Sequence, residues 1–169
     1  MQNFLICLIT IVLFAGCQSK QEAAAPSNTN DISTQRKEAS VKLTQQAIVF
    51  IEQKNIKDAL SGLDAAIKLD PTNQDPYLIL GQILIKAGQY DHAVDLLDNA
   101  AKSFTDNGMV FYMLSVANKM ADKKLPAALS ARRSFEIFKQ NNDKDNALKS
   151  AALLQEIIAM PDHPISDAK

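Results

Sequence analysis

Residues 74–107, which read QDPYLILGQILIKAGQYDHAVDLLDNAAKSFTDN, decide how this chain folds. In each half of the stretch, apolar residues recur at helical spacing, at Tyr77, Leu80 and Leu84 and then at Ala93, Leu97 and Ala100. Gly88 lies between the two halves, and glycine can take the positive φ that ends a helix. Gly81 and Ala93 are small enough for two helices to cross closely. The stretch therefore predicts two antiparallel helices joined by a tight turn.

Similar residues return at a fixed interval on both sides of this stretch. Ala59, Ala93 and Ala127 are 34 residues apart. The same interval relates further sets, which are Leu43, Tyr77 and Phe111; Gln46, Leu80 and Leu114; Ala47, Gly81 and Ser115; Leu63, Leu97 and Ala131; and Ala66, Ala100 and Ser134. A period of this length is typical of an array of helical hairpins. We therefore expect an all-α solenoid of about three hairpins over residues 34–141, with units at 40–73, 74–107 and 108–141.

The spacing resembles the tetratricopeptide repeat (TPR), whose signature places aromatic, Leu, Gly, Tyr, Ala, Phe and Pro residues at set offsets within 34 residues. The second unit matches through Tyr77, Leu80, Gly81, Tyr90, Ala93, Leu97 and Ala100. The first unit matches through Leu43, Ala47, Phe50, Ala59, Leu63, Ala66 and Pro71. The resemblance implies a TPR-type α-solenoid that presents a surface to another protein.

The third unit departs from the pattern and is followed by one more helix. It has Asn118, Lys124 and Ser134 where the second unit has Leu84, Tyr90 and Ala100. Residues 142–160 predict a capping helix, because Asp143 suits a helix start and Met160–Pro161 a stop. Its expected buried stripe is Ala147, Ala151, Leu154 and Ile158. Residues 161–169 are expected to form a short tail.

The first residues differ in kind from the array. Phe4–Ala15 is an almost unbroken apolar run of 12 residues. A membrane-spanning helix needs about 20 apolar residues, whereas a run of this length is typical of a signal-peptide core. We interpret residues 1–16 as a signal peptide. The alternative, a buried N-terminal helix, does not explain the polar stretch that follows.

Cys17 ends a motif that resembles a bacterial lipobox, Leu13-Phe14-Ala15-Gly16-Cys17. The resemblance implies that Cys17 becomes the mature N-terminus and carries acyl chains such as palmitate. Phe14 stands where the motif usually has Leu, and Met1–Asn3 contains no Lys or Arg. Gln18, rather than Asp, follows the cysteine, which implies sorting to the outer membrane, facing the periplasm. Residues 17–33 are polar and small, so beyond the lipidated cysteine they predict a flexible tether.

Composition argues against a chemical site. Once the signal peptide is removed with Cys7, Cys17 is the single remaining cysteine. His92 and His163 are far apart in sequence, so they do not form a zinc site. The sequence contains neither a Gly-rich phosphate loop nor a G-x-S-x-G elbow. We therefore expect no catalytic activity, no metal and no cofactor, and the net charge of −1 gives no overall basic field for nucleic acid.

Charge is nevertheless unevenly distributed. Residues 119–139 carry six basic side chains against Asp122 and Glu136, whereas the middle unit is mainly acidic. One interpretation is two ordinary solvated surfaces. The other is a basic end that meets an acidic partner, an anionic lipid or a neighbouring copy.

The TPR resemblance also predicts where a partner would bind. In TPR arrays the first helix of each hairpin lines the concave face, and the corresponding exposed positions here are unusually apolar. The predicted partner-binding groove is Ile48, Ile51, Leu78, Gln82, Ile85, Met109, Tyr112, Val116 and Met120. Thr44 and Ile48 occupy the places where some TPR domains begin a clamp for a terminal carboxylate, so we do not expect such tails to bind. An amphipathic helix or an extended peptide fits an apolar groove.

Two questions stay open at the level of sequence. A terminal helix could fill the groove as ordinary core, leaving no room for a partner. The function could be that of a membrane-anchored adaptor or assembly factor in the bacterial envelope, with a protein or peptide partner. Alternatively, the chain could be a constitutive structural subunit of a pilus, secretion or cell-wall complex. The sequence names neither the partner nor the oligomeric state.

Overall fold

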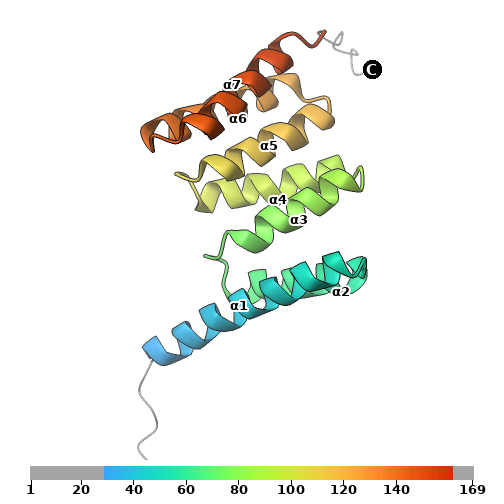
Figure 1. Ribbon diagram of the computed structural model, residues 1–169, viewed down its shortest axis with the longest axis vertical. Coiled ribbons are helices and arrows are strands. Elements are labelled where there is room, and N and C mark those ends of the chain that lie inside the picture. Colours follow the sequence, from blue (N-terminus) through green and yellow to red (C-terminus); the bar gives the residue numbers. More distant parts are fainter. Residues whose placement is uncertain (1–28, 162–169) are drawn as a thin grey trace, which may run out of the picture.

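The computed structural model describes residues 29–161, and within that range the chain forms seven helices and no strand. In chain order they are α1 (Thr29–Glu52), α2 (Ile56–Leu69), α3 (Asp75–Lys86), α4 (Tyr90–Ser103), α5 (Gly108–Met120), α6 (Lys124–Gln140) and α7 (Lys144–Ile158). Figure 1 shows them stacked along the long axis from α1 to α7. The predicted signal peptide 1–16, Cys17, most of the predicted tether and residues 162–169 lie outside the described residues.

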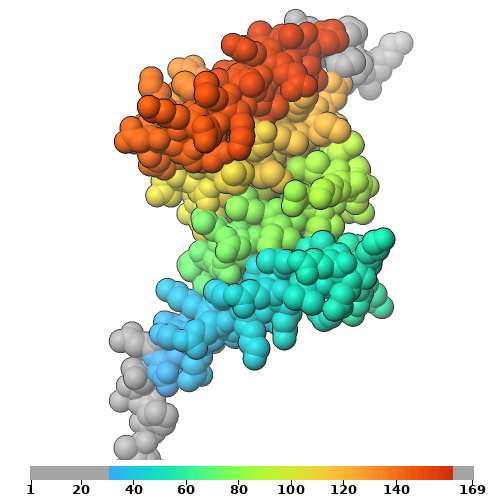
Figure 2. Space-filling model, in the orientation of Figure 1, coloured from blue at the N-terminus to red at the C-terminus, as the bar shows by residue number. Residues whose placement is uncertain are grey.

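The helices pair as antiparallel hairpins. The pairs are α1 with α2, α3 with α4, and α5 with α6, and α7 packs against α6. Successive hairpins contact one another from α2 to α3 and from α4 to α5. Figure 2 shows the same order as successive bands along the molecule. The predicted all-α, TPR-type solenoid of three hairpins and a C-terminal helix is therefore confirmed.

A turn of one kind closes each hairpin. Lys54, Gly88 and Asp122 have φ values of 60°, 73° and 61°, and they are spaced by the 34-residue period. The residue after each donates its backbone N–H to a carbonyl five residues earlier, at 2.8, 2.9 and 2.8 Å respectively. This is the Schellman arrangement, in which one left-handed residue reverses the chain at a helix end. Glycine occupies that place only in the second hairpin, so Lys54 and Asp122 adopt a backbone conformation that disfavours a Cβ.

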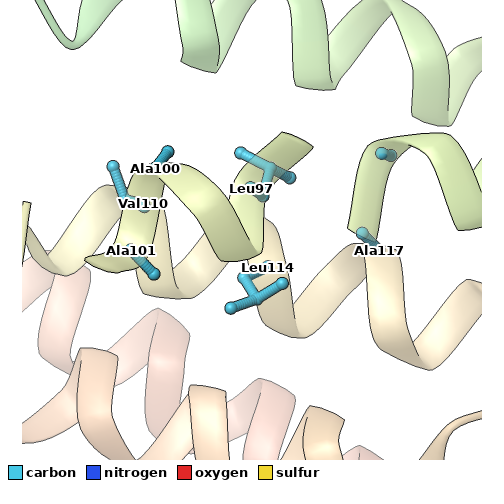
Figure 3. Packing of buried hydrophobic residues seen from close by; sticks show 7 residues of the cluster. Leu97, Ala100, Ala101, Val110, Leu114 and Ala117 are labelled. Atoms are coloured by element: carbon cyan, nitrogen blue, oxygen red, sulfur yellow. The ribbon is translucent and has the colours of Figure 1, made fainter. Parts of the chain in front are cut away.

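Small residues let the paired helices approach closely. The equivalent alanines Ala59, Ala93 and Ala127 are all fully buried. At Gly81 a Cβ atom would lie 3.0–3.1 Å from the Leu97 side chain, which is tighter than ordinary contact. Figure 3 shows Leu97 and Leu114 within the central cluster that joins α4 to α5. These contacts explain why the small residues recur at the sequence period.

The three departures of the third unit have structural roles. Ser134 is fully buried, where its hydroxyl donates to the Gly108 carbonyl at 2.8 Å and lies 2.8 Å from the Ser150 hydroxyl of α7. Lys124 Nζ donates to the Met160 carbonyl, just beyond the end of α7, at 2.6 Å. Asn118 is buried and its side chain donates to the Leu114 carbonyl at 3.0 Å. Two of the three departures therefore attach α7 to the third hairpin.

The structure places the start of the helical region earlier than we expected. The sequence predicts a tether through residue 33, but α1 already begins at Thr29. Asp31 lies in the first turn, where its negative charge interacts favourably with the helix dipole. Residues 31–38 of α1 are exposed.

The buried stripe of α7 also differs from the prediction. The helix buries Ala147, Ser150, Leu153 and Ile157, whereas Ile158, which we expected to be buried, is 62% exposed. Ala151 and Leu154 are half-buried. Apolar periodicity alone predicts the wrong stripe because a serine occupies its centre. Ser150 is buried there because its hydroxyl has partners in Ser134 and in the Asn146 carbonyl at 2.9 Å.

Candidate interaction surface

The most open part of the predicted groove is a hollow between α1 and α3. Its volume is about 400 Å³, and its lining is Val41, Thr44, Gln45, Ile48, Asn73, Asp75, Leu78 and Ile79. The outline of the molecule is indented where the first hairpin meets the second (Figure 2). Val41 and Ile48 are 47% and 41% exposed, so aliphatic side chains of this wall face solvent. We call this feature the α1–α3 hollow.

The hollow exists because the first two hairpins meet mainly through one helix of the first. Contact between them runs from α2 to α3, whereas α3 contacts α5 directly and α5 contacts α7. The edge of the junction is fixed by polar groups. The Asn73 side chain donates to the Ser40 hydroxyl at 3.0 Å, and that hydroxyl donates to the Ala66 carbonyl at 2.9 Å. The hollow is therefore bounded at this edge by a hydrogen-bonded junction.

Asp70 holds the connection between α2 and α3, and Tyr77 of α3 packs nearby against Phe104. The Tyr77 and Phe104 rings meet edge to face with their centroids 5.6 Å apart. Burial, and then the nearby Asp70 carboxylate, raises the pKa of the Tyr77 hydroxyl above its ordinary value. Asp70 is itself buried and accepts hydrogen bonds from the Thr72 hydroxyl and backbone N–H at 2.6 and 3.0 Å. The connection between α2 and α3 thus has a defined geometry.

Thr44, at the place where some TPR domains begin a carboxylate clamp, lies in the lining of the hollow but is itself buried. Its hydroxyl donates to the Ser40 carbonyl one turn earlier, at 2.8 Å. Its neighbour Gln45 is exposed and lines the hollow together with Ile79, the equivalent residue of the next unit. Gln45 and Ile79 are lining residues that the prediction missed, as is Asn73. The 34-residue spacing of Gln45 and Ile79 was visible in the sequence, but their direction was not.

A second hollow lies beside the first, along the contact between the first two hairpins. Its volume is about 260 Å³, and the predicted residues Ile51 and Gln82 line it beside Ile56, Ile83 and Lys86. Ile51 also packs against a cluster of Ala47, Ala59 and Leu63 in the first hairpin. Ile85 packs against the central cluster that joins α4 to α5. Four predicted residues, Ile48, Ile51, Leu78 and Gln82, therefore border the open seam between the first two hairpins.

The third-unit part of the predicted groove is covered by α7. Tyr112 and Val116 pack against the cluster that contains Leu153 and Ile157 of α7. Met109 and Tyr112 line a separate hollow of about 270 Å³ whose other side includes Asn146 and Lys149. An ion pair between Lys119 and Glu156 joins α5 to α7, while Met120 stays 45% exposed. The predicted groove is open at the first two hairpins and partly filled by a terminal helix at the third.

Residues 29–161 contain neither a metal-ligand cluster nor a helix that could span a membrane. No group of three or more His, Cys, Asp or Glu side chains is arranged there to hold a metal ion. None of the seven helices combines the length and apolar character needed to cross a bilayer.

Comparison with known proteins finds a family match over part of the helical array. Residues 50–115, from the end of α1 into α5, match the family described as tetratricopeptide repeat. None of the curated protein sequences matches the chain. Repeats of this family generally form interaction surfaces rather than catalytic sites.

Solved structures share the fold at low sequence identity. PcrH from Pseudomonas aeruginosa has a TM-score of 0.66 at 15% identity, over 73% of this chain and 94% of that one. The type III secretion translocator chaperone SycD of Yersinia enterocolitica gives 0.64 at 17%, over 72% and 92%. The first TPR of Spaghetti (RPAP3), solved bound to the HSP90 peptide SRMEEVD, gives 0.63 at 13%, over 72% and 92%. At these identities the likeness shows the fold alone.

Proposed function

We propose that this protein is a lipid-anchored adaptor of the bacterial envelope that binds a helical segment of a partner protein in the α1–α3 hollow. The observation that carries the proposal is the hollow itself, with Val41, Ile48 and Leu78 in its lining. Exposed aliphatic side chains around a concavity are typical of protein interaction sites. The likeness to a TPR domain solved with a peptide supports a protein or peptide ligand for this chain also.

The lining favours an amphipathic helix as the ligand. Aliphatic groups of α1 and α3 form its walls, and Gln45, Asn73 and Asp75 supply polar groups. A helix that places apolar residues at i, i+3 and i+4 into such a groove leaves its polar face in solvent. A clamp for a terminal carboxylate is not expected here, because Thr44 is buried against Ser40 and Ile48 is aliphatic.

The membrane anchor is proposed from the sequence. The motif that ends at Cys17 supports lipidation, and Gln18 supports the periplasmic face of the outer membrane. More than one acyl chain gives stable anchoring, since each buried methylene contributes about 0.8 kcal/mol. An anchored adaptor would search for its partner along the membrane surface.

Residue-specific crosslinking in intact cells tests the ligand site. A photo-crosslinking side chain at Ile48 should capture a defined partner, and one at Val49 should not. Val49 is a matched control because it lies on the same helix, is 47% exposed and is absent from the hollow. In a pull-down without a crosslinker, Ile48→Asp with Leu78→Asp should abolish recovery of that partner while the purified variant stays helical. Equal capture from both positions would contradict the proposal.

Fractionation tests the anchor separately. Cys17→Ser should move the protein from the membrane to the periplasmic fraction, whereas Cys7→Ser should not. Unchanged membrane association of Cys17→Ser would refute lipid anchoring without bearing on the hollow.

A partner that exchanges on washing supports an adaptor, and co-purification at fixed stoichiometry supports a constitutive subunit.

A further inference from the structure

The outward face of α6 carries the most exposed group of large apolar side chains in the described chain. Leu125 and Leu129, one helical turn apart, are 69% and 59% exposed. Ile158 of α7 is 62% exposed, and it borders the same shallow hollow as Leu125 and Ala128. Contiguous exposed leucines on a helix surface are unfavourable in water unless something covers them. We call this group the α6 patch.

Concave surfaces lie on both sides of Leu125 and Leu129. One hollow, of about 280 Å³, lies between the start of α6 and the end of α7. The other, of about 320 Å³, lies between α4 and α6, and Phe111, Leu114 and Leu129 are among its lining. Each could receive an aliphatic or aromatic side chain. The surface thus offers a ridge of leucines with a hollow on each side.

The C-terminal half of the same face of α6 is basic. Arg132, Arg133 and Lys139 are exposed there, on the helix face that carries Leu125 and Leu129. Arg132 Nε lies 3.1 Å from the carboxylate of Glu136, which is one helical turn further along α6. Arg133 lies over the Phe111 ring and donates one N–H to the Thr105 carbonyl at 3.0 Å. A guanidinium has five N–H groups, so Arg133 can still bind a carboxylate at the edge of the hollow.

We propose that the α6 patch is a second docking surface, which binds an acidic amphipathic helix of a partner protein along α6. Apolar side chains of that helix cover Leu125 and Leu129 and enter the two hollows. Its carboxylates lie against Arg133 and Lys139, while Arg132 keeps its pairing with Glu136, because opposite charges direct the register. The surface is separate from the α1–α3 hollow and does not depend on the adaptor function or on lipidation.

Shape favours a protein over an anionic membrane as the occupant. A bilayer surface would accept Leu125 and Leu129 and would interact with the arginines. It would, however, leave the hollow lined by Phe111 and Leu114 unfilled, since that hollow lies between two helices. A peptide side chain can enter the hollow, and the nearby Arg133 can bind a carboxylate.

Binding of a defined probe tests the proposal. The probe is a fluorescent synthetic amphipathic helix with leucines at i and i+4 and glutamates on its remaining positions. The comparison peptide has lysines in place of the glutamates. Fluorescence anisotropy should show binding of the acidic peptide that weakens as salt is raised, and at least tenfold weaker binding of the basic peptide.

Variants locate the binding site. Leu129→Ser and Arg133→Gln should each weaken binding of the acidic peptide by about tenfold. Glutamine at position 133 can keep the hydrogen bond to Thr105 while it removes the charge. The matched control is Leu148→Ser, because Leu148 is a leucine of α7 that is 68% exposed but outside both hollows. Circular dichroism of each variant should match that of the parent protein.

Three results would overturn the proposal. The first is no binding of the acidic peptide, or equal binding of both peptides. The second is an equal loss of affinity in Leu148→Ser and Leu129→Ser. The third is binding to phosphatidylglycerol vesicles that is lost in Leu129→Ser while the acidic peptide is not bound, which would assign the patch to a membrane.

Discussion

The hydroxyl oxygens of Ser134 on α6 and Ser150 on α7 lie 2.8 Å apart in the core, and this contact attaches the terminal helix to the last hairpin. The Ser134 hydroxyl also lies 2.8 Å from the Gly108 carbonyl, and the Ser150 hydroxyl lies 2.9 Å from the Asn146 carbonyl. Each hydroxyl has one proton, so two protons are shared among these three contacts. Both side chains are fully buried. The equivalent positions in the first two units are Ala66 and Ala100, so this polar contact belongs to the hairpin that α7 covers.

Replacing one serine should lower the free energy of unfolding by more than half as much as replacing both. Ser134→Ala leaves the Ser150 hydroxyl with the Asn146 carbonyl as its partner, and Ser150→Ala leaves the Ser134 hydroxyl with the Gly108 carbonyl. Each single variant therefore loses the contact between the two hydroxyls, at a cost of about 0.5–1.5 kcal/mol. The double variant removes both groups, so its effect should be smaller than the sum of the two single effects. Urea denaturation of the four proteins measures the coupling. Additive effects would show that the two hydroxyls do not interact energetically.

Substitutions at the left-handed turn position should change stability in opposite directions in the first and second hairpins. Gly88→Ala should destabilise the protein by about 1 kcal/mol, because alanine is strained at a φ of 73° although no atom lies within 4 Å of its Cβ. Lys54→Gly should stabilise by about 0.5–1 kcal/mol, since relief of strain exceeds the added chain entropy. Thermal unfolding measures both changes. A loss of stability in Lys54→Gly would contradict the assignment of strain at that turn.

Gly108 should be the glycine least tolerant of a side chain. A Cβ there would lie 2.9 Å from the Phe138 ring, so Gly108→Ala should destabilise by about 1–3 kcal/mol. Phe138→Leu should recover part of that loss in the Gly108→Ala background. The matched control is Gly62→Ala, whose Cβ would meet its nearest neighbour at 3.6 Å. Alanine there should stabilise α2 by up to about 1 kcal/mol, because alanine is the better helix former.

Protonation of Asp143 should weaken the start of α7. The Asn146 side chain and backbone N–H donate to its carboxylate at 2.7 and 3.1 Å. These hydrogen bonds hold the pKa of Asp143 below its ordinary value of 3.8. A carboxylate of this kind stabilises the folded state above its unfolded pKa, and the contribution is lost as pH falls through the folded value.

Comparison with Asp143→Ala isolates this effect. The Tm of the parent protein should exceed that of the variant most at neutral pH. The difference should begin to shrink as pH falls below about 4, where the carboxyl of the unfolded chain becomes protonated, and should be lost once pH falls through the lower pKa of the folded state. A difference in Tm that stays constant from neutral to acid pH would show that Asp143 does not act through its charge.

Much of the fold could be predicted because the evidence for it is local and repeated. Ala59, Ala93 and Ala127 recur at one interval because each fills the same close crossing between two helices. Gly88 predicts a turn because glycine itself can take the positive φ that ends a helix. The turns at Lys54 and Asp122 adopt the same conformation without glycine, so their equivalence follows from the period rather than from residue type.

The candidate site was less predictable, because exposure depends on neighbours that are distant in the sequence. Ile48 and Leu78 border an open hollow, whereas Tyr112 and Val116, at related positions, pack against a cluster that includes residues of α7. In the sequence, Leu125 and Leu129 are an apolar pair at the spacing of one helical turn. The sequence could not show that this pair faces solvent on α6.

By itself the sequence determined the repeat, the hairpins, their turns and the small residues at the helix crossings, because each follows from periodicity and backbone preference. Tertiary structure alone decided which polar groups are buried, as at Thr44 and Ser150, and which part of the groove is open. The physical reason is that burial depends on how a helix is rotated against its neighbours. That rotation is set by the packing of all adjacent helices together.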